Sequence, residues 1–462
     1  MLTRRDLLRH SSAGFGYLAL AGLANSMAPK TFADGIAAAH PLAPKEPHFP
    51  ARAKRVIFLC MQGGPSHVDT FDYKPALIRD QGKRARYGGE LLASPWKFRQ
   101  RGQSGLWTSD LFPEVAEHAD DLCLVRSMNC DQPVHPGAMT QMHTGTAQFV
   151  RPSIGAWTLY GLGTENESLP GFVSLSPPAG GSRNYSSAFL PAIYSGTKVG
   201  RGGGRLAQLA RLTGNQDSIP DIKNGKLSET QQRKQLNLIQ SLNRSQMPSQ
   251  DHDHIEGVIQ SYELAFRMQN AMPELMDLSQ ESEATLAMYG ADAGPTQTFG
   301  KQCILARRLA ESGVRFIEIT HGNWDQHVRL TEDHAARAEA CDRPIAALLA
   351  DLKQRDMLKD TLVIWGGEFG RTPSAQNGNG RNHNNKGYTL WMAGGGVKGG
   401  FSYGATDEHG FEAVEDKCHV HDWHATVLHL LGLDHTRLTY RYAGRDYRLT
   451  DVYGEVAKKI LA

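Results

Sequence analysis

The chain has 462 residues, of which 40% are hydrophobic and 21% charged, so it can bury a large core and is not disordered as a whole. Its 50 Lys and Arg residues against 48 Asp and Glu residues give a formal net charge of +2, which argues against a nucleic-acid partner held by overall charge. Six cysteines are too few for a disulfide scaffold of this length.

The first 39 residues have the pattern of an export signal. Arg4 and Arg5 precede two leucines, and residues 11–24 form a Gly- and Ala-rich apolar run that is too short to span a membrane. This pattern resembles a twin-arginine (Tat) signal peptide, with small residues suited to cleavage at 37–39 or at 26–28. A basic N-terminus on an ordinary Sec signal is the alternative. The resemblance implies a periplasmic or extracellular protein, exported by the Tat translocase and without a membrane span in the mature chain.

The rest of the chain alternates between apolar runs and helical patterns, after a Pro-rich stretch at 40–54 that we expect to be an extended linker. Such alternation indicates an α/β fold with a mostly parallel central sheet flanked by helices. Continuous apolar runs are typical of strands buried on both faces. They predict strands at 56–61, 121–127, 171–176, 314–319, 361–365 and 388–393, with helices at 299–312 and 332–354 among them.

Residues 213–295 differ from this alternating pattern. They are rich in Gln, Ser, Asn and charge, with helical spacing at 227–243 and 254–270. We interpret them as a helical insertion or cap within a single α/β domain.

Polar clusters follow several of the predicted strands. Ligands of an open α/β sheet bind beyond the carboxyl ends of its strands, so we expect these clusters to face one cavity. Imidazole with carboxylate is a ligand set for Zn, Mn or Fe, and carboxylate alone suits Ca or Mg. The sequence therefore predicts one or more divalent metal ions, with the ligands His67, Asp69, Asp325, His327, Glu368 and His383.

Other motifs are weaker. His419, His421 and His424 have the spacing of metal ligands, but they lie where a helix is expected to start, so hydrogen bonding around a site explains them equally well. The sequence contains no G-x-S-x-G motif of a serine hydrolase and no H-E-x-x-H zinc motif.

Five segments carry a resemblance to a known family. They are GGPSHVDTFDYKP at 63–75, HGNWDQH at 321–327, GGEFGRTP at 366–373, RNHNNKGYTLWMAGGGVKGG at 381–400 and HVHDWHATVLHLLGLDH at 419–435. Over about residues 50–455 the chain resembles the DUF1501 family, exported proteins distantly related to sulfatases and alkaline phosphatases. The resemblance implies a sulfatase-like α/β domain at 55–455 with a metal-centred site.

The segment HPGAMTQMHTG at 135–145 resembles the segment that holds the sulfatase nucleophile. His135 falls on the nucleophile position and Met139 on the position of its arginine. In the segment around Glu368 the carboxylate of the sulfatase pattern is kept, while Phe369 replaces the second ligand. Three interpretations of His135 stay open: a ligand of a metal whose hydroxide attacks directly, a nucleophile, or part of a site that only binds. We expect His135 to start a helix and, because a helix N-terminus disfavours imidazolium, to be neutral.

These observations favour an exported metal-dependent hydrolase, acting on a small anionic sulfate or phosphate ester or on a sulfated polysaccharide. Arg371 is a candidate for pairing with the ester oxygens, and a structural ion pair is its alternative role. The rival hypothesis is an exported non-catalytic binding protein on the same fold. An open coordination position on the metal separates the two, because a hydrolase needs one.

Overall fold

The computed structural model describes residues 41–178, 181–200, 227–245 and 252–462. The predicted export signal at 1–39 lies outside these ranges, as do residues 213–226 of the predicted insertion. Within the described ranges, no helix is both long enough and apolar enough to cross a membrane.

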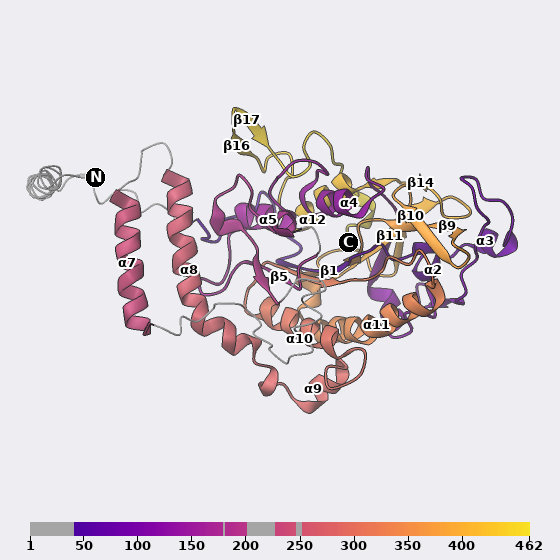
Figure 1. The fold of residues 1–462 in the computed structure, drawn as a ribbon, viewed down its shortest axis with the longest axis horizontal. Coiled ribbons are helices and arrows are strands. Elements are labelled where there is room, and N and C mark those ends of the chain that lie inside the picture. The colour runs from indigo at the N-terminus through magenta and orange to yellow at the C-terminus, as the bar shows by residue number, and fades with distance from the viewer. Residues whose placement is uncertain (1–40, 179–180, 201–226, 246–251) are drawn as a thin grey trace, which may run out of the picture. The chain divides into compact units, whose positions relative to one another are not determined.

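A nine-stranded sheet forms the centre of the domain (Figure 1). Its strands are β1 (Arg55–Met61), β4 (Leu122–Asn129), β5 (Phe172–Leu175), β6 (Thr197–Val199), β7 (Phe316–His321), β8 (Thr361–Gly366), β11 (Tyr388–Ala393), β12 (Phe401–Tyr403) and β15 (Cys418–His419). The strand order is β12–β4–β11–β8–β1–β7–β5–β6, and β15 also pairs with β4. In this described sheet β11 runs antiparallel to both of its neighbours, whereas the other pairings are parallel.

The expected α/β class with a mostly parallel sheet is therefore confirmed. Each of the six predicted strand runs forms a strand, within a few residues of its predicted bounds. The central strand β1 is buried at every residue after Arg55, as expected of a strand covered on both faces.

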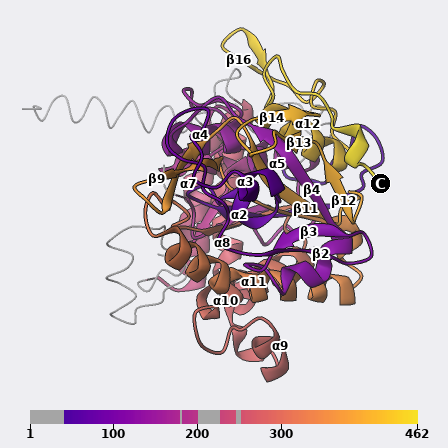
Figure 2. The ribbon, with the colours of Figure 1, turned by 90° about the vertical axis from the view of Figure 1, so that its right-hand side faces the viewer.

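Helices cover both faces of the sheet (Figures 1 and 2). One face carries α4 (His135–Thr144), α5 (Ile154–Leu162) and α12 (Val420–Leu430), and the other carries α10 (Gln297–Glu311) and α11 (Leu330–Gln354). The last two correspond to the helices predicted at 299–312 and 332–354. Helix α10 packs against β7 and β1, and the loops that follow these two strands contribute to the site.

The predicted helical insertion contains α7 (Glu229–Ser245), α8 (His252–Met276) and α9 (Glu283–Met288). Helices α7 and α8 pack against each other, and Arg233 forms an ion pair with Glu263 between them at 2.7 Å. Helix α8 contacts α10 and the short helix η3 (Ala192–Tyr194), which attaches the pair to the sheet domain.

The stretch expected to be a linker is docked on the domain. The amide of Lys45 donates to the carbonyl of Leu162 at the end of α5, and the amide of Arg52 donates to the carbonyl of Leu430 at the end of α12, both at 2.9 Å. Residues 41–54 therefore run along the domain surface and tie two helix ends together.

Short helices and hairpins complete the architecture. The helices α2 (His67–Thr70) and α3 (Pro75–Arg79) follow β1. Antiparallel hairpins are formed by β2 (Phe98–Arg101) with β3 (Leu106–Ser109), β9 (Gly370–Gln376) with β10 (Gly380–Asn384), β13 (Ala405–Thr406) with β14 (Ala413–Glu415), and β16 (Tyr440–Tyr442) with β17 (Arg445–Tyr447). The hairpin β9–β10 was not predicted from the sequence, and it carries part of the site.

Candidate metal centre

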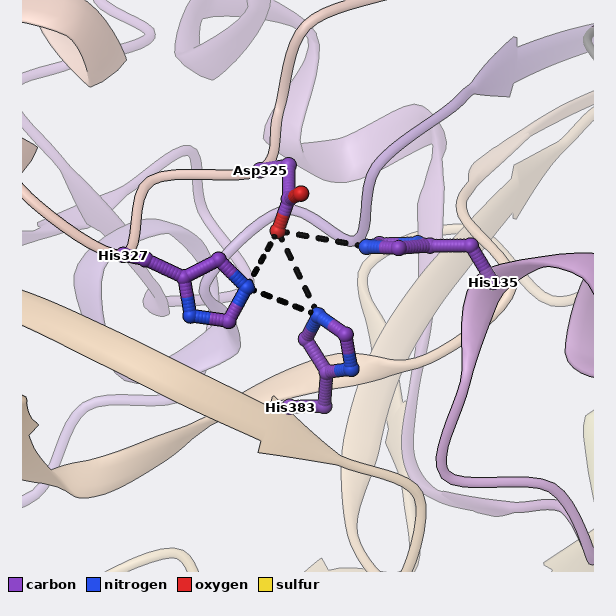
Figure 3. Close-up of side chains that lie close together, drawn as sticks. All are labelled: His135, Asp325, His327 and His383. Carbon is purple, nitrogen blue, oxygen red and sulfur yellow. Dashed lines mark hydrogen bonds and ion pairs between the residues drawn. The ribbon is translucent and has the colours of Figure 1, made fainter.

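Four side chains from distant parts of the chain meet beyond the carboxyl ends of β4 and β7 (Figure 3). His135 is the first residue of α4, which follows β4, and Asp325 and His327 lie in the loop after β7. His383 comes from β10. One potential ligand atom from each side chain lies within 4.8 Å of those of the other three, so the four form a candidate metal centre.

The three imidazoles point their Nε2 atoms at the same carboxylate oxygen (Figure 3). The distance from Asp325 Oδ1 to Nε2 is 2.9 Å for His327, 3.2 Å for His135 and 3.3 Å for His383. Metal–ligand bonds of about 2.0–2.2 Å in a tetrahedron put neighbouring ligand atoms roughly 3.3–3.6 Å apart. The three distances from Asp325 Oδ1 to the imidazole nitrogens are therefore close to the spacing of ligands around one bound ion.

The opposite nitrogen of each ring has an acceptor of its own. His383 Nδ1 lies 2.8 Å from the carbonyl oxygen of Pro133, which can only accept, so this nitrogen carries the proton. His135 Nδ1 lies 2.7 Å from Glu368 Oε1, and His327 Nδ1 lies 2.6 Å from Gln376 Oε1. In a neutral ring a protonated Nδ1 leaves Nε2 as an acceptor. Partners of this kind on the far nitrogen are what orient metal-binding histidines in proteins.

Glu368 is held in place behind His135. Its side chain is fully buried, and its two oxygens accept from the amide of Gly63 at 3.0 and 3.1 Å. Gly63 has a φ of +114°, and a Cβ there would lie 2.7 Å from the backbone nitrogen of Trp324. Only glycine fits this close approach of the β1 and β7 loops. Glu368 therefore lies next to the four-residue centre as an orienting carboxylate of His135.

The charge state of His135 differs from the expectation of a neutral imidazole. Burial alone would lower its pKa, but the contacts with Asp325 and Glu368 raise the pKa to about 9. The two carboxylates therefore raise the pKa of His135 by more than the N-terminus of α4 lowers it, because a helix N-terminus contributes at most about 2 kcal/mol. In the metal-free protein His135 is an imidazolium at neutral pH, and a metal ion has to displace its Nε2 proton.

Asp325 is an ionised carboxylate. Burial opposes ionisation, but the imidazoles of His135 and His383 and the guanidinium of Arg371 hold its pKa far below the usual range. Asp325 therefore carries its negative charge at every physiological pH and can offer it to a cation.

Arg371 lies on β9 with no solvent exposure, so it cannot reach an ester outside the protein. Its Nη2 pairs with Asp325 Oδ1 at 2.5 Å, and its other nitrogens donate to backbone carbonyls that include that of Gly64 at 3.0 Å. These contacts give Arg371 the structural ion pair that was the alternative to pairing with ester oxygens: the residue positions Asp325 and ties the β1 loop to the β9–β10 hairpin.

Asp69 also has a partner that the sequence did not reveal. Its carboxylate forms a bidentate ion pair with Arg381 at 2.7 and 3.0 Å, and both side chains are fully buried. Ser66 donates a further hydrogen bond to Asp69 at 2.5 Å. These contacts leave Asp69 in a structural ion pair and outside the four-residue centre.

His67 likewise lies outside the four-residue centre. Its buried ring bonds the carbonyl oxygen of Gly410 through Nε2 at 2.8 Å. Of the six predicted ligands, the structure brings Asp325, His327 and His383 together, places Glu368 next to them, and gives His67 and Asp69 other partners.

The side chains aligned with other parts of the sulfatase pattern pack rather than bind. Phe369 is buried, with its ring centroid 4.8 Å from that of His135 and 4.6 Å from that of His383. It therefore forms an apolar support beneath two of the imidazoles.

The histidines of the segment 419–424 support α4. His421 Nε2 and His424 Nε2 both lie 2.7 Å from backbone carbonyls at the end of α4, those of Gly145 and Met142. His419 caps the N-terminus of α12 in a reciprocal pair with Asp422. These three histidines therefore form hydrogen bonds at the C-terminal end of α4 and at the N-terminus of α12.

The centre opens to solvent. The side chains of Asp325 and His327 are 42% and 33% exposed, whereas that of His383 is 16% exposed. A ligand from solution can therefore reach the carboxylate and the imidazoles.

The family model of DUF1501, a protein of unknown function, matches residues 53–461. A search of curated proteins finds no match to the chain. The solved structures similar in chain trace include PsFucS1 sulfatase from Pseudoalteromonas sp., at 12% identity and a TM-score of 0.32 over 83% of this chain and 68% of that one. They also include the lipoteichoic acid synthase LtaP from Listeria monocytogenes, at 8% identity and a TM-score of 0.38 over 88% and 78%. A third is the phosphonate monoester hydrolase SpPMH from Silicibacter pomeroyi, at 11% identity and a TM-score of 0.34 over 82% and 73%.

Proposed function

This chain belongs to the DUF1501 family, and we propose that its four-residue centre holds a divalent metal with which it hydrolyses a sulfate or phosphate ester. The observation that carries the proposal is the convergence of three imidazole Nε2 atoms on one carboxylate oxygen, with each Nδ1 bound to an acceptor behind it. The proposal that the substrate is a sulfate or phosphate ester rests on the segments that resemble those of sulfatases.

The donor set fits a transition metal better than calcium. Calcium takes six to eight oxygen ligands, whereas this centre offers three nitrogens and one carboxylate. Imidazole suits zinc, iron and manganese in combination with a carboxylate. Of the metals expected from the sequence, the geometry therefore favours zinc, iron or manganese.

A metal in such a site polarises the oxygen of a bound ester and makes a coordinated water acidic enough to ionise near neutral pH. The protein's own part is to fix this geometry. Glu368 holds His135 through Nδ1, and Arg371 holds Asp325, so both side chains are oriented toward the centre before an ester binds. This arrangement supports the interpretation of His135 as a ligand over that of a nucleophile, because its Nε2 faces the centre.

The substrate is proposed to be a small anionic ester or a sulfated polysaccharide, the two classes that the resemblance to sulfatases implies.

Export belongs to the same proposal. The pattern of Arg4 and Arg5 ahead of an apolar run supports passage through the Tat pathway to the periplasm or beyond. Replacing both with lysine is expected to retain the protein in the cytoplasm, which cell fractionation would show; export at the normal level would contradict the Tat assignment.

One observation favours the rival hypothesis of an exported protein that binds without catalysing. Four protein ligands complete a tetrahedron, and zinc sites closed in this way are structural. The hydrolase requires that one of the four, with Asp325 the most exposed, gives way to substrate or that the metal accepts a fifth ligand.

The experiment that separates the two functions combines metal analysis with turnover. Protein purified without chelator is analysed for its metals and is then assayed on aryl sulfates and aryl phosphates. The matched variants are His327→Ala, which loses a ligand, and His429→Ala, which removes a histidine outside the centre. Hydrolysis that is lost in the first variant and kept in the second supports the enzyme. Bound metal without hydrolysis of either ester class supports the binding protein, and absence of metal contradicts both.

A further inference from the structure

A second group of ligand-type side chains lies inside the core, beneath α4. Cys60 is on β1, Glu318 is on β7 and His143 is on α4, and one ligand atom from each lies within 4.8 Å of the others. The relative exposure of each of the three residues is at most 1%. We refer to Cys60, His143 and Glu318 as the core cluster.

The ring of His143 is oriented as a ligand. Its Nδ1 lies 2.8 Å from the backbone carbonyl of Met139, one helical turn earlier, and a carbonyl can only accept. Nδ1 therefore carries a proton and Nε2 points away from the helix. Nε2 lies 3.3 Å from Glu318 Oε1. A nitrogen lone pair and a carboxylate oxygen at this distance repel each other unless a proton or a metal ion lies between them.

The core cluster has unused acceptor capacity. Among the described residues, Glu318 Oε2 has no hydrogen-bond partner. The hydroxyl of Ser174, the register partner of Glu318 on β5, also has none. Leaving a buried polar group unpaired costs about 1–3 kcal/mol, and more for a charged group. A single proton between His143 and Glu318 does not satisfy the second carboxylate oxygen, whereas a cation can bind the carboxylate through both oxygens.

Cys60 supplies the soft donor of the group. Within the described residues its Sγ has a single weak hydrogen-bond contact, with Met139 Sδ at 4.0 Å, and this contact does not explain the place of the thiol beside a carboxylate. Burial raises the pKa of the Cys60 thiol, and the charges of Glu318 and Glu368 raise it further. In the metal-free core the thiol therefore keeps its proton.

We propose that Cys60, His143 and Glu318 bind a zinc-class metal ion in the core, separate from the exposed four-residue centre. A thiolate, an imidazole and a carboxylate are all zinc ligands, with bonds of about 2.3, 2.0–2.1 and 2.0–2.2 Å, and neighbouring ligand atoms in a tetrahedron then lie roughly 3.3–3.6 Å apart. The 3.3 Å between His143 and Glu318 matches that spacing. Binding releases the Cys60 proton together with any proton that His143 and Glu318 share.

The two sites differ in accessibility, and this makes them separable. The exposed centre opens to solvent at Asp325, whereas the core cluster is closed by α4 on one side and by the sheet on the other. A chelator is expected to strip the exposed centre from the folded protein and to reach the core ion only when the protein unfolds. The inference does not rest on the proposed hydrolysis.

The test uses cobalt, which replaces zinc and absorbs in the near ultraviolet when a thiolate binds it. The full chain is produced with Co²⁺, and both cobalt per chain and this absorption are measured before and after dialysis against a chelator. The variants are Cys60→Ser, His327→Ala and, as a matched control, Cys303→Ser, which alters another buried free cysteine. Two ions are expected in the wild-type chain and in the control. Dialysis against the chelator should remove one of the two cobalt ions, and the near-ultraviolet absorption of the cobalt–thiolate bond should remain.

Each of the two site variants should lose a different one of the two ions. Cys60→Ser is expected to lose the absorption and one ion, whereas His327→Ala should lose one ion and keep the absorption. If Cys60→Ser does not fold, X-ray absorption spectroscopy of the wild-type zinc protein decides, because a core ion requires a sulfur neighbour at about 2.3 Å. A wild-type chain with a single cobalt and no sulfur absorption, or with a sulfur absorption that survives in Cys60→Ser, overturns the proposal.

Discussion

His327 and His383 face each other through their Nε2 atoms at 3.0 Å. The Nδ1 of His383 donates to a backbone carbonyl, and that of His327 faces the side-chain oxygen of Gln376. The same two Nε2 atoms lie 2.9 Å and 3.3 Å from Asp325 Oδ1. Ligand-type atoms from three side chains thus converge on one point, and this convergence is the physical reason to regard them, together with His135, as a candidate cation site.

The first prediction concerns these two imidazoles. His327→Ala and His383→Ala each remove one of four donors, and we expect the metal affinity to fall by more than about 100-fold, beyond the 10- to 100-fold cost of losing an outer-shell partner. Isothermal titration of the apo protein with Zn²⁺ measures it. His429→Ala should bind like the wild type, and unchanged affinity in both site variants would exclude this centre.

A second prediction tests Glu368 as the residue that positions His135. Glu368→Gln keeps the volume but removes the charge behind Nδ1, so we expect metal affinity to fall by about 10- to 100-fold. A competition assay with a coloured chelator provides the measurement. Because the pKa of His135 is raised partly by Glu368, the variant should also show a lower His135 pKa in the metal-free protein by NMR. A loss of affinity without this shift would indicate a general structural defect instead.

Metal binding should depend on pH through His135. Its pKa of about 9 in the metal-free protein means that a proton occupies Nε2 below that value and competes with the metal. Raising the pH from 6.5 toward 9 should therefore strengthen apparent metal affinity, by up to about tenfold per pH unit for one displaced proton. Titrations at several pH values check the slope, and an affinity independent of pH in this window would contradict the coupling.

The same group makes the stability of the metal-free protein depend on pH. A histidine whose folded pKa exceeds its unfolded value of 6.5 contributes stability that is fully present below pH 6.5 and is lost as the pH rises through about 9. Urea denaturation of the apo protein at pH 6.5 and at pH 9.5 should show this loss, and His135→Ala should reduce it.

Another prediction distinguishes a structural role of Asp69 from metal binding. Asp69→Asn leaves Arg381 buried without its charge partner, which costs about 3–5 kcal/mol of folding free energy. The metal content of the folded protein should not change, because Asp69 lies outside the centre. Denaturant unfolding and metal analysis measure the two properties separately. Asp446→Asn, which breaks an exposed ion pair with Arg441, serves as control and should cost no more than about 1 kcal/mol.

The fold was predictable because its strands are continuous apolar runs. The run at 56–61 forms β1, and the loops after β7 and β8 carry Asp325, His327 and Glu368 as the rule for strand ends requires. A strand buried on both faces has no polar side, so its residues form a continuous apolar run that can be recognised from the local sequence alone. The segment resemblance added His135, which no strand pattern would have selected.

The partners of charged residues could not be predicted from local pattern. Asp69 and Arg381 lie far apart in the sequence, and nothing near either residue indicates that they form a buried pair. The same holds for Arg371, whose place beside an acidic motif suggested a ligand for anions, whereas the β9–β10 hairpin turns it into the core. The core cluster has no spacing signature at all, because its members lie inside two strands and one helix.

The wide separation of the ligands along the chain has a consequence for biogenesis. Four strands of the nine-stranded sheet (β5, β6, β7 and β8) lie between His135 and His383 in sequence, and among the four ligands only Asp325 and His327 are close in sequence. A nascent chain cannot assemble the exposed centre until the β9–β10 hairpin has been synthesised and has docked against α4. On the proposed function, the ion is therefore acquired only after this docking, and metal retention would report that β10 has reached its place beside the start of α4.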